Sequence, residues 1–149
     1  MKKVFWGAKI LLFLFPGMAF ADTANEAFEK GKEAHLNGDD ITAAKWFRKA
    51  AEQGHVNAQS ILGLMYYEGK GVPQNFAEAA KWFRKAAEQG HVNAQSMLGL
   101  MYHDGKSVPQ DYMQSYIWLS IAANLSGDLR EQIVKIRDAV VKGLSPKQL

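Results

Sequence analysis

A long segment of this chain occurs twice, 36 residues apart. The stretch KWFRKAAEQGHVNAQSILGLMYYEG begins at Lys45, and the stretch KWFRKAAEQGHVNAQSMLGLMYHDG begins at Lys81. The copies differ at three positions only, Ile61/Met97, Tyr67/His103 and Glu68/Asp104. A fixed period of about 20–50 residues is typical of solenoids, in which each unit buries its apolar face against the next unit. The repeat therefore predicts a stacked architecture and favours binding over catalysis.

The spacing of apolar residues within the repeat is helical. Between Ala43 and Ala51 they recur with the period of an amphipathic helix, and Gly54 is placed to end that helix with a positive φ. A second apolar stripe has its members at i, i+4 and i+8: Ala58, Leu62 and Tyr66. Gly63 lies beside this stripe. Since glycine inside a helix costs about 1 kcal/mol relative to alanine, we expect Gly63 to let a neighbouring helix approach closely.

The pattern predicts an all-α chain of about seven helices. Each repeat contains a helix, a loop, a second helix and a short turn rich in glycine and proline, with no sign of a β-sheet. The expected helices cover residues 24–36, 40–53, 56–68, 76–89, 92–104, 112–125 and 128–142. Recurrence of tryptophan at one position of the repeat indicates a core between repeats rather than a ligand site. The residues concerned are Trp46, Trp82 and Trp118.

The N-terminus has the features of a secretory signal peptide. Two lysines precede an apolar stretch over residues 4–15, which a Pro-Gly pair ends, and Ala19-Phe20-Ala21 supplies small residues at the −3 and −1 positions of a cleavage site. The stretch is too short for a spanning helix. We therefore expect residues 1–21 to be removed, leaving a periplasmic or secreted protein that begins at Asp22 and has no stable membrane anchor. The alternative is an uncleaved anchor.

Removal of the signal peptide changes the charge of the chain. The full sequence has 18 Lys and Arg against 15 Asp and Glu; the signal segment holds three lysines and no acid, so residues 22–149 carry 15 of each. A net charge of zero gives no support to nucleic-acid binding, which needs a basic face. The absence of cysteine excludes disulfides and thiolate metal sites. Apolar packing must therefore hold residues 22–149 together as one domain.

The repeat resembles the Sel1-like repeat, a relative of the tetratricopeptide repeat. The resemblance rests on AEAAKWFRKAAEQGHVNAQSMLGLMYHDGKSVPQDY, above all on Ala86-Ala87-Glu88-Gln89-Gly90, Leu98-Gly99 and Val108-Pro109. It covers residues 24 to about 145. The repeat units are expected near 24–55, 56–91 and 92–127, with a capping helix over 128–142. The resemblance implies a right-handed α-solenoid that mediates protein–protein interaction, as in bacterial members that are frequently exported.

The chain departs from the family pattern in two places. Its first unit has Asn37-Gly38-Asp39-Asp40 where the other units have a longer turn containing glycine, valine and proline. The cysteine pair of a disulfide-rich branch is absent. That branch is associated with penicillin binding and β-lactam hydrolysis, so the missing cysteines weaken any carry-over of that activity to this chain.

Two E-x-x-H patterns suggest a metal site, Glu52/His55 and Glu88/His91. On a continuous helix such ligands share a face, but the intervening glycine is expected to end the helix and to separate them. The two copies lie one repeat apart, roughly 10 Å, too far to share an ion. We therefore expect solvent-exposed loop histidines, with no metal and no cofactor. Motifs of hydrolases, zinc proteases and phosphate-binding loops are also missing, so the sequence predicts no enzyme.

The resemblance also points to a binding surface, because the first helix of each pair lines the concave groove of tetratricopeptide-like solenoids. The candidate groove residues are Asn57, Ser60, Leu64, Tyr67, Asn93, Ser96, Leu100 and His103. The alternative is that these side chains pack against neighbouring helices. Tyr67 and His103 share one slot in two nearly identical units, and we hypothesise that this slot tunes recognition.

Three classes of function remain open. The first is an exported scaffold that binds a protein or peptide partner in the groove. The second is an immunity or inhibitor protein that neutralises a toxin or an envelope enzyme. The third is a cell-wall hydrolase that interacts with β-lactams, which the missing nucleophile and base disfavour.

Overall fold

Seven α-helices and no strand make up the part of the chain that this computed structural model describes, which is residues 16–106, 108–125 and 130–143. The helices are α1 (Pro16–Leu36), α2 (Asp40–Glu52), α3 (Val56–Glu68), α4 (Phe76–Glu88), α5 (Val92–Asp104), α6 (Tyr112–Leu125) and α7 (Arg130–Gly143). Six of them lie within two residues of the predicted bounds. The prediction of an all-α solenoid is confirmed.

The first helix is longer than predicted. It begins at Pro16, eight residues before the expected start at residue 24, and it runs without a break to Leu36. The Pro-Gly pair that the sequence suggested as a helix breaker therefore forms the first turn instead. Proline is tolerated there because the first amide groups of a helix have no intrahelical partner.

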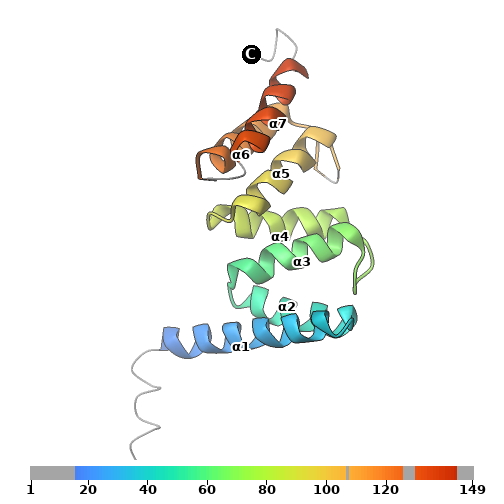
Figure 1. Ribbon diagram of the computed structural model, residues 1–149, viewed down its shortest axis with the longest axis vertical. Coiled ribbons are helices and arrows are strands. Elements are labelled where there is room, and N and C mark those ends of the chain that lie inside the picture. The colour runs from blue at the N-terminus through green and yellow to red at the C-terminus, as the bar shows by residue number, and fades with distance from the viewer. Residues whose placement is uncertain (1–15, 107, 126–129, 144–149) are drawn as a thin grey trace, which may run out of the picture.

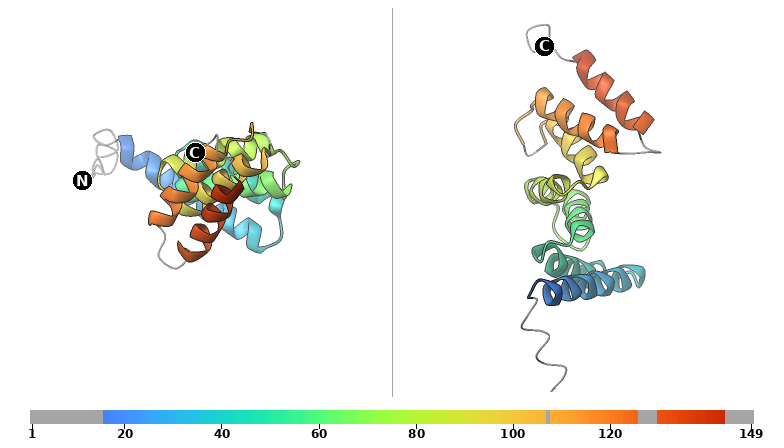
Figure 2. Two further views of the ribbon diagram at one scale, coloured as in Figure 1. Left: turned by 90° about the horizontal axis from the view of Figure 1, so that it is seen from above. Right: turned by 90° about the vertical axis from the view of Figure 1, so that its left-hand side faces the viewer.

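Consecutive helices pack against each other in one continuous stack. Contacts join α1 to α2, α2 to α3, and so on in chain order to α7. Figure 1 shows α1 at one end of the stack and α7 at the other, and the right-hand view of Figure 2 shows the same elongated arrangement. The layout is that of a solenoid, in which each unit contacts only its neighbours.

Glycine lets each pair of helices approach closely. A Cβ atom built on Gly31 of α1 would lie 2.7 Å from the ring of Phe47, and one built on Gly63 of α3 would lie 2.8 Å from the ring of Phe83. Gly99 of α5 faces Leu119 in the same way, at 2.8 Å. The expectation for Gly63 is confirmed, and the arrangement recurs in all three pairs.

The core consists of small and aromatic side chains. Alanines that are completely buried, such as Ala50 and Ala86, bring helices together, while Phe47 and Phe83 fill the space between them. Trp82 is 5% exposed, and Trp46 and Trp118 are half-buried against the same cluster. The predicted tryptophan core is therefore confirmed.

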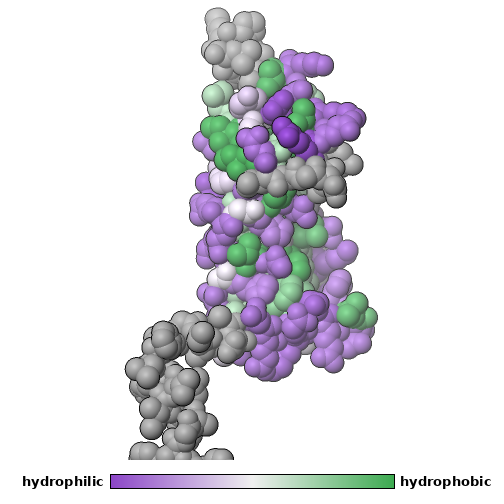
Figure 3. Space-filling view, turned by 60° about the vertical axis from the view of Figure 1, so that its left-hand side comes forward, coloured by the Kyte–Doolittle hydropathy of each residue, from purple (hydrophilic) through white to green (hydrophobic). Residues whose placement is uncertain are grey.

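The face shown in Figure 3 is mostly hydrophilic, with separate hydrophobic patches. One exposed apolar set belongs to α6: Met113, Tyr116, Ile117 and Ile121. The positions of α4 that lie 36 residues before Ile117 and Ile121 are Lys81 and Lys85. The third pair thus departs from the first two on its outer surface.

Candidate functional site: the interface between the first helices

The recurring glycine contacts define equivalent positions in successive units. We call α1, α3 and α5 the first helices and α2, α4 and α6 the second helices. Gly31 and Gly63 are 32 residues apart, whereas Phe47 and Phe83, which they face, are 36 apart. The difference arises because residues 37–39 connect α1 to α2, while residues 69–75 connect α3 to α4.

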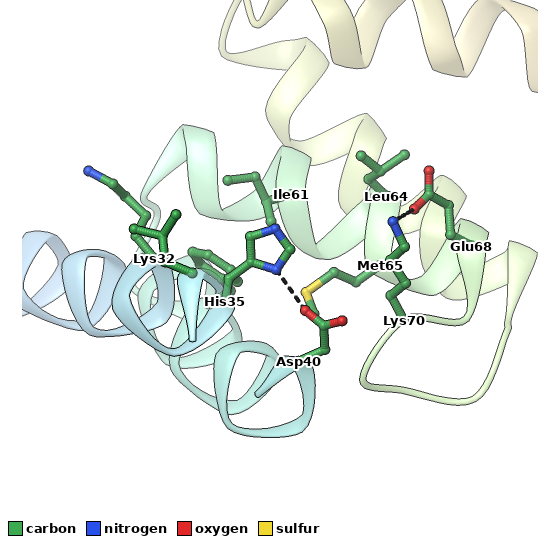
Figure 4. A pocket seen from close by; sticks show the side chains of 10 residues that line it. Lys32, His35, Asp40, Ile61, Leu64, Met65, Glu68 and Lys70 are labelled. Atoms are coloured by element: carbon green, nitrogen blue, oxygen red, sulfur yellow. Dashed lines mark hydrogen bonds and ion pairs between the residues drawn. The ribbon is translucent and has the colours of Figure 1, made fainter. Parts of the chain in front are cut away.

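A pocket of about 300 Å³ lies between α1 and α3, beside α2, and we call this region the first interface. Figure 4 shows the side chains that surround it, which come from both first helices, from α2 and from the loop after α3. The lining residues are Lys32, His35, Leu36, Asp40, Phe47, Ile61, Leu64, Met65, Glu68 and Lys70.

The pocket combines apolar walls with a charged rim. Phe47 and Met65 are buried at its base, and Leu64 on α3 is 41% exposed. Leu36, at the end of α1, is 83% exposed. Such a mixture of apolar surface and few polar groups is common in ligand sites, although this volume is at the lower limit of their usual range.

Two ion pairs cross the rim (Figure 4). Nδ1 of His35 lies 2.6 Å from Oδ1 of Asp40, which joins the end of α1 to the start of α2. Nζ of Lys70 lies 3.0 Å from Oε2 of Glu68. The Glu68 carboxylate accepts a hydrogen bond from the Lys70 ammonium, and this bond together with its negative charge raises the pKa of Lys70 above the ordinary value.

The same positions between α3 and α5, which we call the second interface, keep four of eight side chains and change the other four. The equivalent pairs, first interface to second, are Lys32/Leu64, His35/Tyr67, Asp40/Phe76, Phe47/Phe83, Ile61/Met97, Leu64/Leu100, Met65/Met101 and Lys70/Lys106.

An aromatic pair replaces the ion pair of His35 and Asp40 in the second interface. The rings of Tyr67 and Phe76 pack edge to face with centroids 5.2 Å apart. Nζ of Lys106 lies 5.6 Å from the Tyr67 ring and 5.7 Å from the Phe76 ring, and it donates a hydrogen bond of 3.3 Å to the Tyr67 hydroxyl. These two larger rings stand at the positions that His35 and Asp40 hold beside the pocket of the first interface.

The third unit has an intermediate arrangement. The His103 ring lies 5.7 Å from the ring of Tyr112, and its Nδ1 lies 2.8 Å from Oδ1 of Asp104. Tyr67 and His103 occupy the position at which the two nearly identical copies differ. His35 occupies the equivalent position in the first unit, beside the pocket. In all three units its side chain contacts the start of the following second helix.

The other predicted groove residues differ in accessibility. Asn57 and Asn93 are exposed in the first turns of α3 and α5. Ser60 is only 9% exposed, and half-buried Ser96 donates a hydrogen bond to the Val92 carbonyl at 3.1 Å. Leu64 lines the pocket, and half-buried Leu100 holds the equivalent place in the second interface. Leu64 is thus the one predicted residue in the pocket, and a role for the whole set in binding stays a prediction.

The expectation of solvent-exposed loop histidines is wrong. His55 and His91 are half-buried N-caps of α3 and α5, and their Nδ1 atoms accept hydrogen bonds from the amides of Ala58 and Ala94 at 3.2 and 3.3 Å. His55 also stacks on Phe28, with ring centroids 4.1 Å apart. Burial lowers the pKa of both histidines, because it disfavours the charged imidazole.

Sequence reasoning missed most of the pocket. Lys32, His35 and Asp40 lie in the unit that repeats least well, so no second copy drew attention to them. The available signal was the short turn after α1, because a shorter connection moves His35 into register with Tyr67. An alignment of the units on these glycine and phenylalanine positions, instead of on the fixed 36-residue period, places His35 in line with Tyr67 and so points to the pocket.

The described residues contain no group of three or more His, Asp or Glu side chains that could hold a metal ion. Within the same residues, no helix is both long enough and apolar enough to cross a bilayer. The side chains that line the pocket offer an apolar surface inside a rim that carries both signs of charge.

Comparison with known proteins agrees with this architecture. The Sel1 repeat family model matches residues 22–55, 56–91 and 92–127. No curated protein matches the chain significantly.

Three solved structures are similar. The protective antigen c5321 of uropathogenic Escherichia coli, which has an SLR fold, is 39% identical with a TM-score of 0.68. The match covers 81% of this chain and 27% of the antigen, so the chain spans about a quarter of that protein. A Sel1 repeat protein of Oxalobacter formigenes is 32% identical with a TM-score of 0.68, over 83% of this chain and 98% of the other.

The cysteine-rich protein B of Helicobacter pylori is 21% identical with a TM-score of 0.63, over 85% of this chain and 98% of its own, and shares the fold. The three family matches fall on the three helix pairs that the glycine contacts define. The chain therefore belongs to the Sel1 repeat family.

Proposed function

We propose that this protein is an exported, non-enzymatic scaffold that binds a partner protein through the face formed by its first helices. Sel1 repeat proteins are commonly scaffolds for protein–protein interaction, and the finer statement for this chain is our proposal. The observation that carries it is the pocket between α1 and α3, where Leu36 and Leu64 remain exposed around a buried base. Exposed apolar residues that surround a cavity are a common feature of interaction sites.

The charges of the rim are consistent with binding a neutral segment of a partner. His35 is in hydrogen-bond contact with Asp40, and the Lys70 ammonium pairs with the Glu68 carboxylate, so the polar groups of both pairs already have partners. A strongly charged ligand would have to break one of these pairs. The apolar base is therefore expected to supply most of the affinity, and the rim to exclude wrong partners.

Site-specific photocrosslinking tests the proposal. A benzophenone amino acid is placed at Leu64, in the pocket, or at Lys81, an exposed position on α4, and cells that export the protein are irradiated. We expect a discrete adduct from position 64 and none from position 81. Equal adducts at both positions, or none at position 64, would contradict a binding role for the face of the first helices.

Export is the second part of the proposal. It rests on the apolar stretch and the Ala19-Phe20-Ala21 sequence at the N-terminus. N-terminal sequencing of protein recovered outside the cytoplasm should return Asp22 as the first residue. Recovery of protein that begins at Met1 would reject cleavage.

A further inference from the structure

The second interface shows which groups the first interface lacks. Between α3 and α5, the chain fills the site with its own aromatic side chains, Tyr67 and Phe76. The ammonium of Lys106 covers both rings and hydrogen-bonds to the Tyr67 hydroxyl. Contact of an ammonium with an aromatic face is favourable, because the ring presents its negative electrostatic face to the cation.

The first interface keeps the surroundings of this site, but the smaller side chains of His35 and Asp40 stand in place of the two rings. Phe47 and Met65 form the same base as Phe83 and Met101, and Lys70 holds the place of Lys106. His35 and Asp40 pair with each other at the edge of the pocket. The Lys70 ammonium pairs with the Glu68 carboxylate, whereas the Lys106 ammonium lies over the rings of Tyr67 and Phe76.

We propose that the pocket between α1 and α3 receives one aromatic side chain, tyrosine or phenylalanine, from the partner protein. The inference rests on the proposed function, and it specifies the partner by the chemistry of its anchoring residue. The chain itself supplies the template, because the same site one repeat later holds such rings. An aliphatic anchor would fill the volume equally well but would gain nothing from Lys70, so the lysine favours an aromatic ring.

Small probes test the aromatic preference without knowledge of the partner. p-Cresol carries the ring and hydroxyl of tyrosine, and 3-methylbutan-1-ol is an aliphatic control. Binding is followed by NMR of ¹³C-labelled methionine methyl groups. Met65 lines the pocket and Met101, at the equivalent position of the second interface, serves as an internal control. Affinities in roughly the millimolar range are expected for probes of this size.

The proposal predicts a saturable shift of the Met65 methyl signal with p-cresol, a weaker one with the alcohol, and no change at Met101. Equal affinity for both probes, or equal shifts at Met65 and Met101, would overturn it.

Two variants sharpen the result. Lys70→Gln, at an exposed side chain, should weaken p-cresol binding about twofold to fivefold and leave binding of the alcohol unchanged. His35→Tyr combined with Asp40→Phe rebuilds the ring pair of the second interface and should abolish the Met65 shift. A Met65 shift that persists in this filled variant, with circular dichroism showing an intact helical fold, would also overturn the proposal.

The outcomes separate this inference from the proposed function. If photocrosslinking at Leu64 captures a partner but p-cresol shows no preference over the alcohol, the scaffold stands and the aromatic anchor is wrong. If p-cresol binds selectively and no crosslink forms at Leu64, the pocket chemistry stands and the proposed scaffold function fails.

Discussion

The first and second interfaces of this solenoid have the same framework and different contents. In both, a glycine of the first helix faces a phenylalanine of the second helix, at 2.7 Å for Gly31 and 2.8 Å for Gly63, measured from a built Cβ atom. In the second interface Tyr67 and Phe76 fill the adjoining space, whereas in the first interface His35 and Asp40 leave a pocket of about 300 Å³. The framework tolerates this exchange because the glycine contact, rather than the aromatic pair, brings the helices together.

The comparison shows how a repeat protein can acquire a site without a change of fold. Stability of a solenoid is approximately a sum over units and the interfaces between neighbours. A unit at the end of the stack can therefore lose part of an interface while the central units keep the structure folded. His35, Asp40 and the exposed Leu36 lie in such an end unit.

The largest expected difference between the interfaces concerns their phenylalanines. Phe83→Ala should lower the free energy of unfolding by about 3–5 kcal/mol, since the side chain is 1% exposed and packed on both sides. Phe47→Ala should cost less, because Phe47 borders the pocket and its removal enlarges a space that is already open. Urea denaturation followed by circular dichroism measures both. Equal losses would contradict the difference in packing.

A smaller effect is expected at the slot that Tyr67 and His35 share. Tyr67→Ala removes the ring contacts with Phe76 and Lys106 and should cost about 1–2 kcal/mol. His35→Ala removes an exposed ion pair and should cost about 0–1 kcal/mol. Thermal unfolding separates the two, with Tyr67→Phe as a control that keeps the ring. An unchanged midpoint for Tyr67→Ala would mean that its ring is free for a partner, as the sequence alone suggested.

The smallest effect concerns the two histidine caps, which start the first helices α3 and α5. Burial lowers the pKa of His55 and His91 in the folded protein, so the unfolded chain binds more protons as the pH falls through about 6.5. Stability should therefore be full above that pH and decline below it. Protonation would also remove the acceptor of the cap hydrogen bond at Nδ1.

Replacement of both caps by asparagine tests this expectation, because asparagine caps a helix and does not titrate there. The double variant His55→Asn, His91→Asn should lose less stability than the wild type between about pH 7.5 and pH 5.5, as measured by urea titration at each pH. Equal losses of stability in the two proteins would show that protonation of His55 and His91 does not cause the decline.

The fold was predictable from the sequence because its signals are local and repeated. Two almost identical copies set the helical period, and Gly63 beside an apolar stripe indicated close packing. The binding site was less predictable because it depends on register between units. His35 aligns with Tyr67 only when the shorter turn is taken into account, and the capping role of His55 depends on a side-chain rotamer that no spacing reveals.

One affinity measurement tests the central claim most directly. The partner captured at Leu64 is titrated with the filled variant, His35→Tyr with Asp40→Phe, and with the wild type. The account predicts binding at least about tenfold weaker than that of the wild type, with a thermal midpoint that is unchanged or raised, because the rings close the pocket and add packing. Wild-type affinity in a folded filled variant would show that the open first interface is not where the partner binds.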